Sequence, residues 1–153
     1  MMASRGTTRG FLASVNKWTR ETHERSEDAF REGSKDFYDA LESATPRLTG
    51  NLRGSLVATV NGNIERSGPT NLDYAEGSGR AESYVNIDNA KLGDRISYKY
   101  RALYWRRLNY GMVGYDSLGR FINQAGRFWI QTVGSRYRSI MRVAASRLRM
   151  KMK

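Results

Sequence analysis

The residues of this 153-residue chain that could do chemistry include a glycine-containing stretch, TPRLTGNLRGSL, at positions 45–56. Its two glycines, the arginine between them and the serine after the second invite comparison with a phosphate-binding loop. Such a loop needs four residues between its glycines and a lysine before the hydroxyl residue, so that backbone N–H groups surround the anion and the amine reaches it. Gly50 and Gly54 are separated by three residues, and no lysine follows them. The spacing therefore argues against nucleotide binding and favours a structural role.

Side chains for acid–base, nucleophilic or metal chemistry are scarce. The chain has no cysteine and one histidine, His23, which excludes thiolate ligands, cysteine nucleophiles and sites with two histidine ligands. Most carboxylates fall in the first helix or in predicted loops, and residues 95–153 carry only Asp116, so no convergent pair of carboxyl groups is indicated. We expect a protein without enzymatic activity, cofactor or bound metal.

Charge divides the chain into two unequal parts. Residues 1–94 carry 12 Lys and Arg against 14 Asp and Glu, whereas residues 95–153 carry 14 against 1. A basic half of this kind suits a polyanion or the acidic half of another copy. Its arginines are interleaved with tyrosine and tryptophan, which can neutralise phosphates and stack on bases. The same residue types are enriched at protein interfaces, and this second interpretation is the one we favour over sequence-specific DNA binding.

The elements that must position these residues begin with a long helix. Apolar or small residues recur every three or four positions over residues 11–44, which predicts an amphipathic helix after a flexible tail at 1–10. Pro46 ends the helix because it restricts the residue before it. Thr49 is predicted to cap a short helical turn that begins at Asn51, and a strand that starts at Leu56 is predicted to lead into a hairpin at Asn61-Gly62.

The rest of the chain completes the predicted fold. Three glycines mark residues 67–80 as a flexible loop or arm, and residues 83–88 are predicted to form a strand. Residues 96–108 begin as a strand with Ile96, Tyr98 and Tyr100 on one side. A closing helix over 129–152 places an apolar seam between two basic flanks, Arg136, Arg147 and Lys151 on one and Arg138, Arg142, Arg149 and Lys153 on the other. The prediction is one α+β domain, 1–153, with a long N-terminal helix, a small antiparallel β-sheet and a C-terminal amphipathic basic helix.

Two motifs together resemble a known family. TPRLTGNLRGSL is similar to the TP-x-x-TG-x-LR-x-S signature of the small neck and tail-completion proteins of tailed bacteriophages, also called minor tail or head–tail joining proteins. YWRRLNYG at 104–111 is similar to the family's Tyr-Ala-Arg-Arg-Leu-Glu-Tyr-Gly, from which Trp105 and Asn109 depart. GRFINQAGRFWIQTV at 119–133 resembles the segment before the family's closing helix. The resemblance covers most of the chain in the right order, and the role of residues 61–95 stays open.

The resemblance implies a non-enzymatic structural virion protein that is assembled in the host cytoplasm. It would form a homo-oligomeric, hexameric ring at the neck or upper tail that completes the tail and joins it to the DNA-filled head. Its neighbours would be the tail terminator or tail tube protein and the head-side connector or stopper protein, with genomic DNA passing through the lumen and no membrane partner. The alternative is a nonspecific DNA-binding protein that uses the basic C-terminal half.

Candidate contact residues follow from these expectations. The acidic first helix of one copy could meet the basic last helix of the next in a head-to-tail contact. Contacts to other subunits or partner proteins are expected from Arg53, Tyr104, Arg106, Arg107, Tyr110, Arg138, Arg142 and Arg149. Contacts to the phosphates of DNA in the channel, without base reading, are expected from Arg120, Arg127, Arg136 and Arg147. The ring's copy number, its exact neighbours and the tail morphology are not determined by the sequence.

Overall fold

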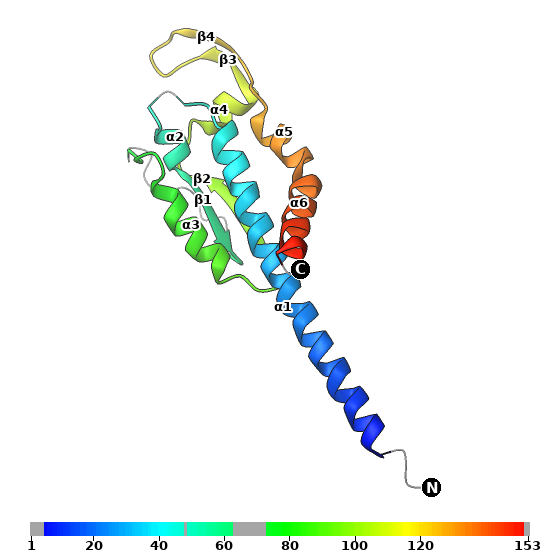
Figure 1. Cartoon of the computed structure of the whole chain (residues 1–153). Coiled ribbons are helices and arrows are strands. Elements are labelled where there is room, and N and C mark those ends of the chain that lie inside the picture. Colours follow the sequence, from blue (N-terminus) through cyan, green and yellow to red (C-terminus); the bar gives the residue numbers. More distant parts are fainter. Residues whose placement is uncertain (1–4, 48, 63–72, 152–153) are drawn as a thin grey trace.

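The structure, a computed structural model, describes residues 5–47, 49–62 and 73–151. It confirms the predicted α+β class, with a long N-terminal helix, short antiparallel strands and C-terminal helices (Figure 1). The strands form two separate two-stranded sheets, β1 with β2 and β3 with β4, where the sequence predicted one small sheet. Among the described helices, none combines the length and the apolarity that a membrane crossing requires.

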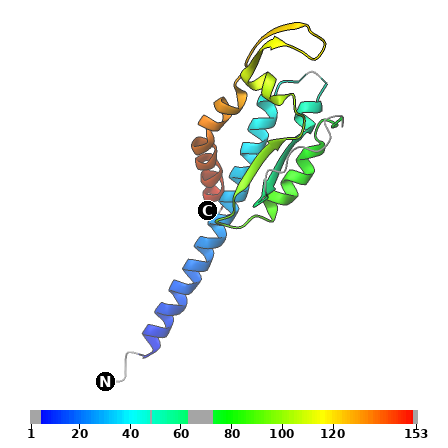
Figure 2. The same cartoon turned by 180° about the vertical axis from the view of Figure 1, so that it is seen from behind.

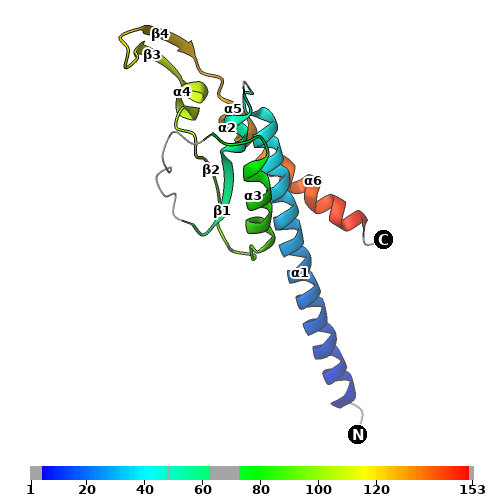
Figure 3. The same ribbon diagram turned by 90° about the vertical axis from the view of Figure 1, so that its left-hand side faces the viewer.

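Helix α1 (Arg5–Ala44) is a single helix with a packed half and a projecting half. It begins within the predicted tail, so residues 5–10 are helical, and it ends just before Thr45-Pro46 as predicted. Tyr38 and Leu41 near its C-terminal end are buried, whereas Phe11 and Trp18 near its start are exposed. The N-terminal half therefore extends away from the rest of the molecule (Figures 1 and 3).

The central sheet pairs β1 (Leu56–Val60) with β2 (Ile96–Tyr100) in antiparallel register, with Ala58 opposite Tyr98. Asn61 prolongs this pairing, because its backbone N–H donates to Arg95 O at 2.8 Å and its side-chain Oδ1 accepts from Arg95 N at 2.9 Å. The described partner of β1 is thus a distant strand. The return strand of the predicted Asn61-Gly62 hairpin would fall on residues 63–72, outside the described residues.

Residues 83–88, predicted as a strand, are part of helix α3 (Ser78–Asp88), so that prediction is wrong. Ser83 and Ile87 are buried one turn apart on the helix face that meets β1. Ser83 Oγ accepts a hydrogen bond from Ala58 N at 2.9 Å, and Asn86 Nδ2 donates to Ala58 O at 2.9 Å. These side chains cover the outer edge of β1, and such tertiary contacts override local strand preference.

The predicted flexible segment 67–80 is only partly described. Residues 73–77 have no regular structure apart from a turn, residues 78–80 begin α3, and 67–72 lie outside the described residues.

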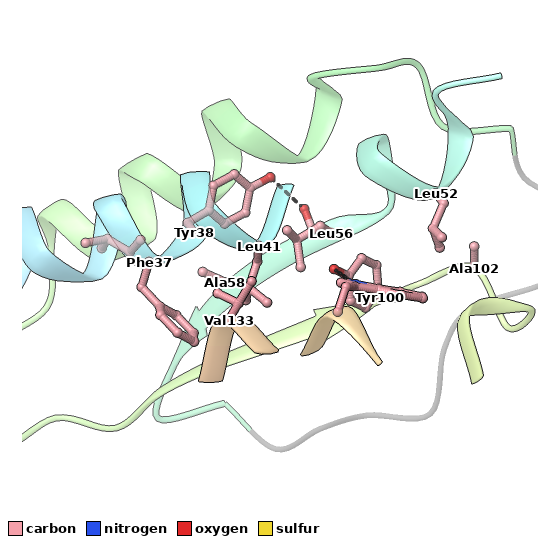
Figure 4. Packing of buried hydrophobic residues seen from close by; sticks show 11 residues of the cluster. Phe37, Tyr38, Leu41, Leu52, Leu56, Ala58, Tyr100, Ala102 and Val133 are labelled. Carbon is pink, nitrogen blue, oxygen red and sulfur yellow. Dashed lines mark hydrogen bonds between the residues drawn. The ribbon is translucent and has the colours of Figure 1, made fainter. Parts of the chain in front are cut away.

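The core lies between α1 and the β1–β2 sheet (Figure 4). Tyr38 of α1 donates its hydroxyl to Leu56 O at 2.9 Å, and Trp129 Nε1 donates to the Tyr100 hydroxyl at 3.0 Å. Ile96, Tyr98 and Tyr100 contribute to this core from one face of β2, as predicted. The other core members are Phe37, Leu41, Leu52, Ala58, Ile87, Ala102 and Val133.

The predicted closing helix is two helices, α5 (Trp129–Ser135) and α6 (Tyr137–Met150). Both pack against α1 (Figures 1 and 2), and α5 also reaches the sheet, because its Trp129 contacts Tyr100 of β2. Ala144 of α6 is buried, and it lies with Met141 against Gly33 of α1, where the missing side chain allows close approach. The apolar seam predicted for the closing helix is therefore used inside the subunit.

Candidate functional site

The TPRLTGNLRGSL stretch closes the C-terminal end of α1. Arg53 donates from Nε to Thr45 O at 2.9 Å and from Nη2 to Ser43 O at 3.2 Å, which satisfies carbonyl groups that a helix end leaves without partners. The Thr45 hydroxyl donates to Leu41 O at 2.6 Å and lies 2.7 Å from the Tyr100 hydroxyl. Because these groups are occupied within one chain, the stretch is a structural clamp.

The glycines of the clamp permit its sharp turn. Gly50, at φ 86°, precedes the short helix α2 (Asn51–Gly54) as its N-cap residue, and no side chain caps that helix. Thr49 Oγ1 accepts from Asn51 N at 3.4 Å, a weak form of the predicted cap. A Cβ on Gly54 would overlap the carbonyl of Ala75. Both glycines are therefore required by the backbone geometry of the turn.

The second motif, YWRRLNYG, forms the base of a projecting β-hairpin that the sequence analysis missed. Helix α4 (Trp105–Tyr110) leads into β3 (Gly111–Tyr115), which pairs with β4 (Phe121–Ala125). Asn109 is fully buried: its Nδ2 donates to Gln131 Oε1 at 3.0 Å, and its backbone oxygen accepts from Phe128 N at 2.9 Å. Leu108 O accepts from Arg127 N at 3.0 Å. These bonds fix both ends of the hairpin to α4 and α5.

One face of the hairpin is apolar and exposed. Tyr115 lies opposite Phe121, with ring centroids 5.5 Å apart in an edge-to-face arrangement, and Val113 follows on the same face. These three side chains and Leu118 at the tip are 61–74% exposed. The turn is closed by Asp116, whose carboxylate accepts from Arg120 N at 2.8 Å and Arg120 Nε at 2.7 Å. The Asp-Ser-Leu-Gly sequence at 116–119 is the turn signal that could have revealed this hairpin.

Electrostatics in the turn keep Asp116 ionised. The backbone hydrogen bond from Arg120 lowers the pKa of Asp116 most, with the Arg120 side chain and the positive charge of Arg107 acting in the same direction. The guanidinium of Arg120, which we expected to contact DNA, is thus engaged within its own turn.

The structure gathers four expected contact residues at the hairpin base. Arg106 lies over the Trp105 ring, 5.5 Å from its centroid, and Tyr110 packs its edge near Phe128 and Trp105. The side chains of Tyr104, Arg106, Arg107 and Tyr110 are exposed. Arg53 is different, because its guanidinium donates to the backbone oxygens of Thr45 and Ser43 and lies 3.6 Å from the Glu76 carboxylate, all within one chain.

A second exposed apolar surface lies at the opposite end of the molecule. Phe11, Leu12, Val15 and Trp18 follow helical spacing on the projecting half of α1, and Phe11 and Trp18 are 67% and 66% exposed. The stripe continues toward Gly33, where α6 covers the helix. This surface and the hairpin thus project from opposite ends of one subunit (Figure 1).

The acidic first helix and the basic last helix, expected to meet between copies, pack against each other within one chain. Arg147 forms an ion pair with Asp36 of α1. Other carboxylates of α1 are paired with Arg31 of the same helix and with Arg80 of α3. Lys35 of α1 reaches the other way, and its Nζ lies 2.6 Å from Asp88 of α3. The expectation that this helix pair supplies the contact between copies is corrected, because the two helices pack on each other within the subunit and most described carboxylates of α1 are paired there.

The remaining arginines of the C-terminal helices differ in their surroundings. Arg136 lines an open groove of about 420 Å³ between α1 and α6, together with Asp36, Ala40, Ile140 and Val143. Arg127 is exposed. Arg138, Arg142 and Arg149 are also exposed, and within residues 5–47, 49–62 and 73–151 none of the three pairs with a carboxylate. In the same described ranges, no cluster of three or more His, Asp or Glu residues could hold a metal ion.

Comparison with known proteins agrees with the two motifs. A family model described as "Bacteriophage HK97-gp10, putative tail-component" matches residues 9–111, which include the clamp at 45–56 and the base of the hairpin. The searches of curated proteins and of solved structures returned no significant match. The matched region covers most of α1, the central sheet, α3 and α4. The chain therefore belongs to the HK97 gp10-like family of bacteriophage tail components.

Proposed function

We propose that this tail component forms a homo-oligomeric ring at the neck or top of the tail, where it completes the tail and joins it to the DNA-filled head. The observation that carries the proposal is the pair of exposed apolar projections at opposite ends of the subunit, the hairpin and the first half of α1. Contiguous exposed apolar surfaces mark places where another protein binds. Because the two surfaces differ, contacts through them are heterologous, and such contacts close into rings when the rotation between copies allows it.

The surface area of the subunit is consistent with an assembled state. The chain exposes 11,120 Å², whereas a compact monomer of 17.4 kDa exposes about 7,900 Å². The excess is about 3,000 Å², and a standard interface buries about 800 Å² on each partner. A ring subunit would form several interfaces of this size. Its neighbours would be two copies of itself, a tail protein below and a head-side connector or stopper above.

The hairpin is suited to docking because its base is fixed before any partner arrives. The buried Asn109 and the backbone bonds at Leu108 and Phe128 hold the two strands at a defined angle. A surface that is already ordered loses little conformational entropy on binding. Aromatic residues such as Tyr115 and Phe121 are also the type that contributes most to binding at interfaces.

The proposal is tested with phage that carries the double variant Tyr115→Ser/Phe121→Ser. Each truncated aromatic is expected to weaken docking by about 2 kcal/mol or more, so heads and tails should accumulate unjoined in electron micrographs. The matched control is Val85→Ser, which also removes an exposed apolar side chain, but one that lies on α3 outside both projections. Cryo-electron microscopy of wild-type particles should place the chain as a ring at the head–tail junction. Normal joining by the double variant, or density for the chain elsewhere in the particle, contradicts the proposal.

A further inference from the structure

We infer that one flank of α6, formed by Arg138, Arg142 and Arg149, is a surface that binds the phosphate backbone of double-stranded DNA. The inference rests on the proposed function, because a ring at the head–tail junction surrounds the path of the genome, and it identifies the surface of the subunit that contacts it. We call these three residues the arginine flank.

The arginine flank is continuous along the helix. Positions 138, 142 and 149 are four and seven residues apart, so they lie on one side of α6 and are separated by about 6 Å and 10 Å along its axis. Ser146 occupies the adjoining row, and serine hydroxyls are common phosphate ligands. These four side chains are exposed. Figure 3 shows α6 crossing α1 at an angle, with its C-terminal end directed away from the rest of the molecule.

The three residues of the arginine flank have no acidic partner among the described residues, whereas several other arginines do. Arg80 pairs with Asp39 and Glu42, Arg101 with Glu82, Arg120 with Asp116, and Arg147 with Asp36. The described part of α5 and α6, residues 129–151, contains no Asp or Glu at all. Unneutralised positive charge concentrated on one helix favours a polyanionic ligand.

Its composition favours phosphates over a protein surface. A protein interface needs buried apolar or aromatic anchors, but the only residue between Arg142 and Arg149 on this side is Ala145. The large apolar side chains of α6 that are exposed, Tyr137, Val143 and Met150, lie about 100° round the helix from the flank, and the Tyr137 ring packs against Phe37 of α1. Val143 belongs to the groove against α1. Phosphate contacts require only positive charge and donors, and they carry no sequence information.

The structure thereby exchanges the roles that the sequence suggested for the two basic flanks. Arg136 and Arg147 were expected to face DNA, yet Arg147 is paired with Asp36 and Arg136 lines the groove between α1 and α6. Arg138, Arg142 and Arg149 were expected to contact other subunits, yet all three are exposed and none pairs with a carboxylate among the described residues.

The test measures binding of the purified full chain to a fluorescent DNA duplex by anisotropy over 50–200 mM KCl. The triple variant Arg138→Gln/Arg142→Gln/Arg149→Gln is expected to reduce the slope of log K against log salt by about 2.7, since each phosphate contact contributes about 0.9. The control Arg9→Gln/Lys17→Gln/Arg20→Gln removes the same net charge from the projecting helix and should change the slope by less than about 1. The single variant Arg142→Gln should reduce it by about 0.9, which keeps the test informative if the triple variant folds poorly.

Three outcomes overturn the inference. In the first, the slope of the arginine-flank variant stays at the wild-type value. In the second, the control variant reduces the slope by the same amount, which means that only net charge matters. In the third, the flank variant blocks head–tail joining while its DNA binding is unchanged, which assigns the flank to an acidic protein surface. The ring itself is judged separately by its density in particles. A chain found at the junction with an inert flank refutes only this inference, and a chain absent from the junction refutes the proposed function whatever the slope.

Discussion

At the scale of single residues, polar side chains of the two motifs bind backbone groups of their own subunit. Arg53 caps the end of α1, and Asn109 ties the hairpin base to α5. Both residues lie in stretches whose types suggested partner binding or phosphate binding. The sequence shows which donors are present, but the acceptors lie on other elements and become visible only in the fold.

Arg53→Ala is expected to lower the free energy of unfolding by about 1–3 kcal/mol, because the carbonyls of Ser43 and Thr45 lose a charged donor while Thr45 stays buried. Arg47→Ala is the matched control: Arg47 pairs with the same Glu76 at 2.8 Å but is mostly exposed, so its loss should cost less than about 0.5 kcal/mol. Urea denaturation of both variants provides the comparison. Equal losses would show that the Glu76 ion pair, and not the helix cap, is what Arg53 contributes.

Buried tyrosines predict a loss of stability at alkaline pH. Burial raises the pKa of Tyr98 and Tyr100 above the usual 10, and it does the same for Tyr38. The unfolded chain releases these protons at lower pH than the folded chain, so the free energy of unfolding falls as pH rises above about 10, by about 1.4 kcal/mol per pH unit for each tyrosine. Tyr98→Phe should remove one such contribution from the slope measured by denaturation between pH 9 and 11. An unchanged slope would mean that Tyr98 ionises equally in both states.

At the scale of elements, close backbone approach decides how the hairpin joins the body. Gly126 faces the backbone of Tyr110 and Asn109, where a Cβ would come within 2.6 Å of Tyr110 C. Gly134 in α5 has no neighbour within 4 Å of such an atom. The two glycines look alike in the sequence but have opposite requirements in the structure.

Gly126→Ala is therefore expected to destabilise the protein by about 1–3 kcal/mol, since backbone must move to accept the methyl group. Gly134→Ala should stabilise it by about 0.5–1 kcal/mol, because alanine is the better helix former at an unobstructed position. Thermal unfolding of the two variants measures the difference directly. If both substitutions change the stability in the same direction, the close backbone contact of Gly126 at the hairpin base is contradicted.

At the scale of the whole molecule, the subunit has a packed body and two projections that contribute little to its own core. The core cluster draws on α1 from Phe37 onward and on no residue of the hairpin strands β3 and β4. The exposed apolar side chains at both ends of the subunit would be covered in the assembly proposed above. Folding and assembly are thus expected to respond to different substitutions.

Trp18→Ala should leave the free energy of unfolding within about 0.5 kcal/mol of the wild type, because the side chain is exposed on the projecting half of α1. The same change should impair joining of heads and tails in infected cells. Glu24→Ala, an exposed position further along the same helix, is the control and should affect neither property. A large loss of stability in Trp18→Ala would show that the projecting half of α1 folds back on its own subunit.

The sequence by itself determined the elements whose signals are local. Helical periodicity located the amphipathic stripe of α1 and the apolar seam of α5 and α6, and Pro46 marked the end of α1. Alternation identified the core face of β2. Family membership was also accessible, because it depends on motif order. Charge asymmetry was visible too, but not where the opposite charges would meet.

Only the tertiary structure decided which elements pair. Residues 83–88 became helix because Ser83, Asn86 and Ile87 pack on β1, and β1 paired with a strand far along the chain. The acidic and basic helices met inside one subunit, which left the arginine flank unpaired. The physical reason is that pairing depends on distances between segments remote in sequence, whereas periodicity and breaker residues act within a few positions of the chain.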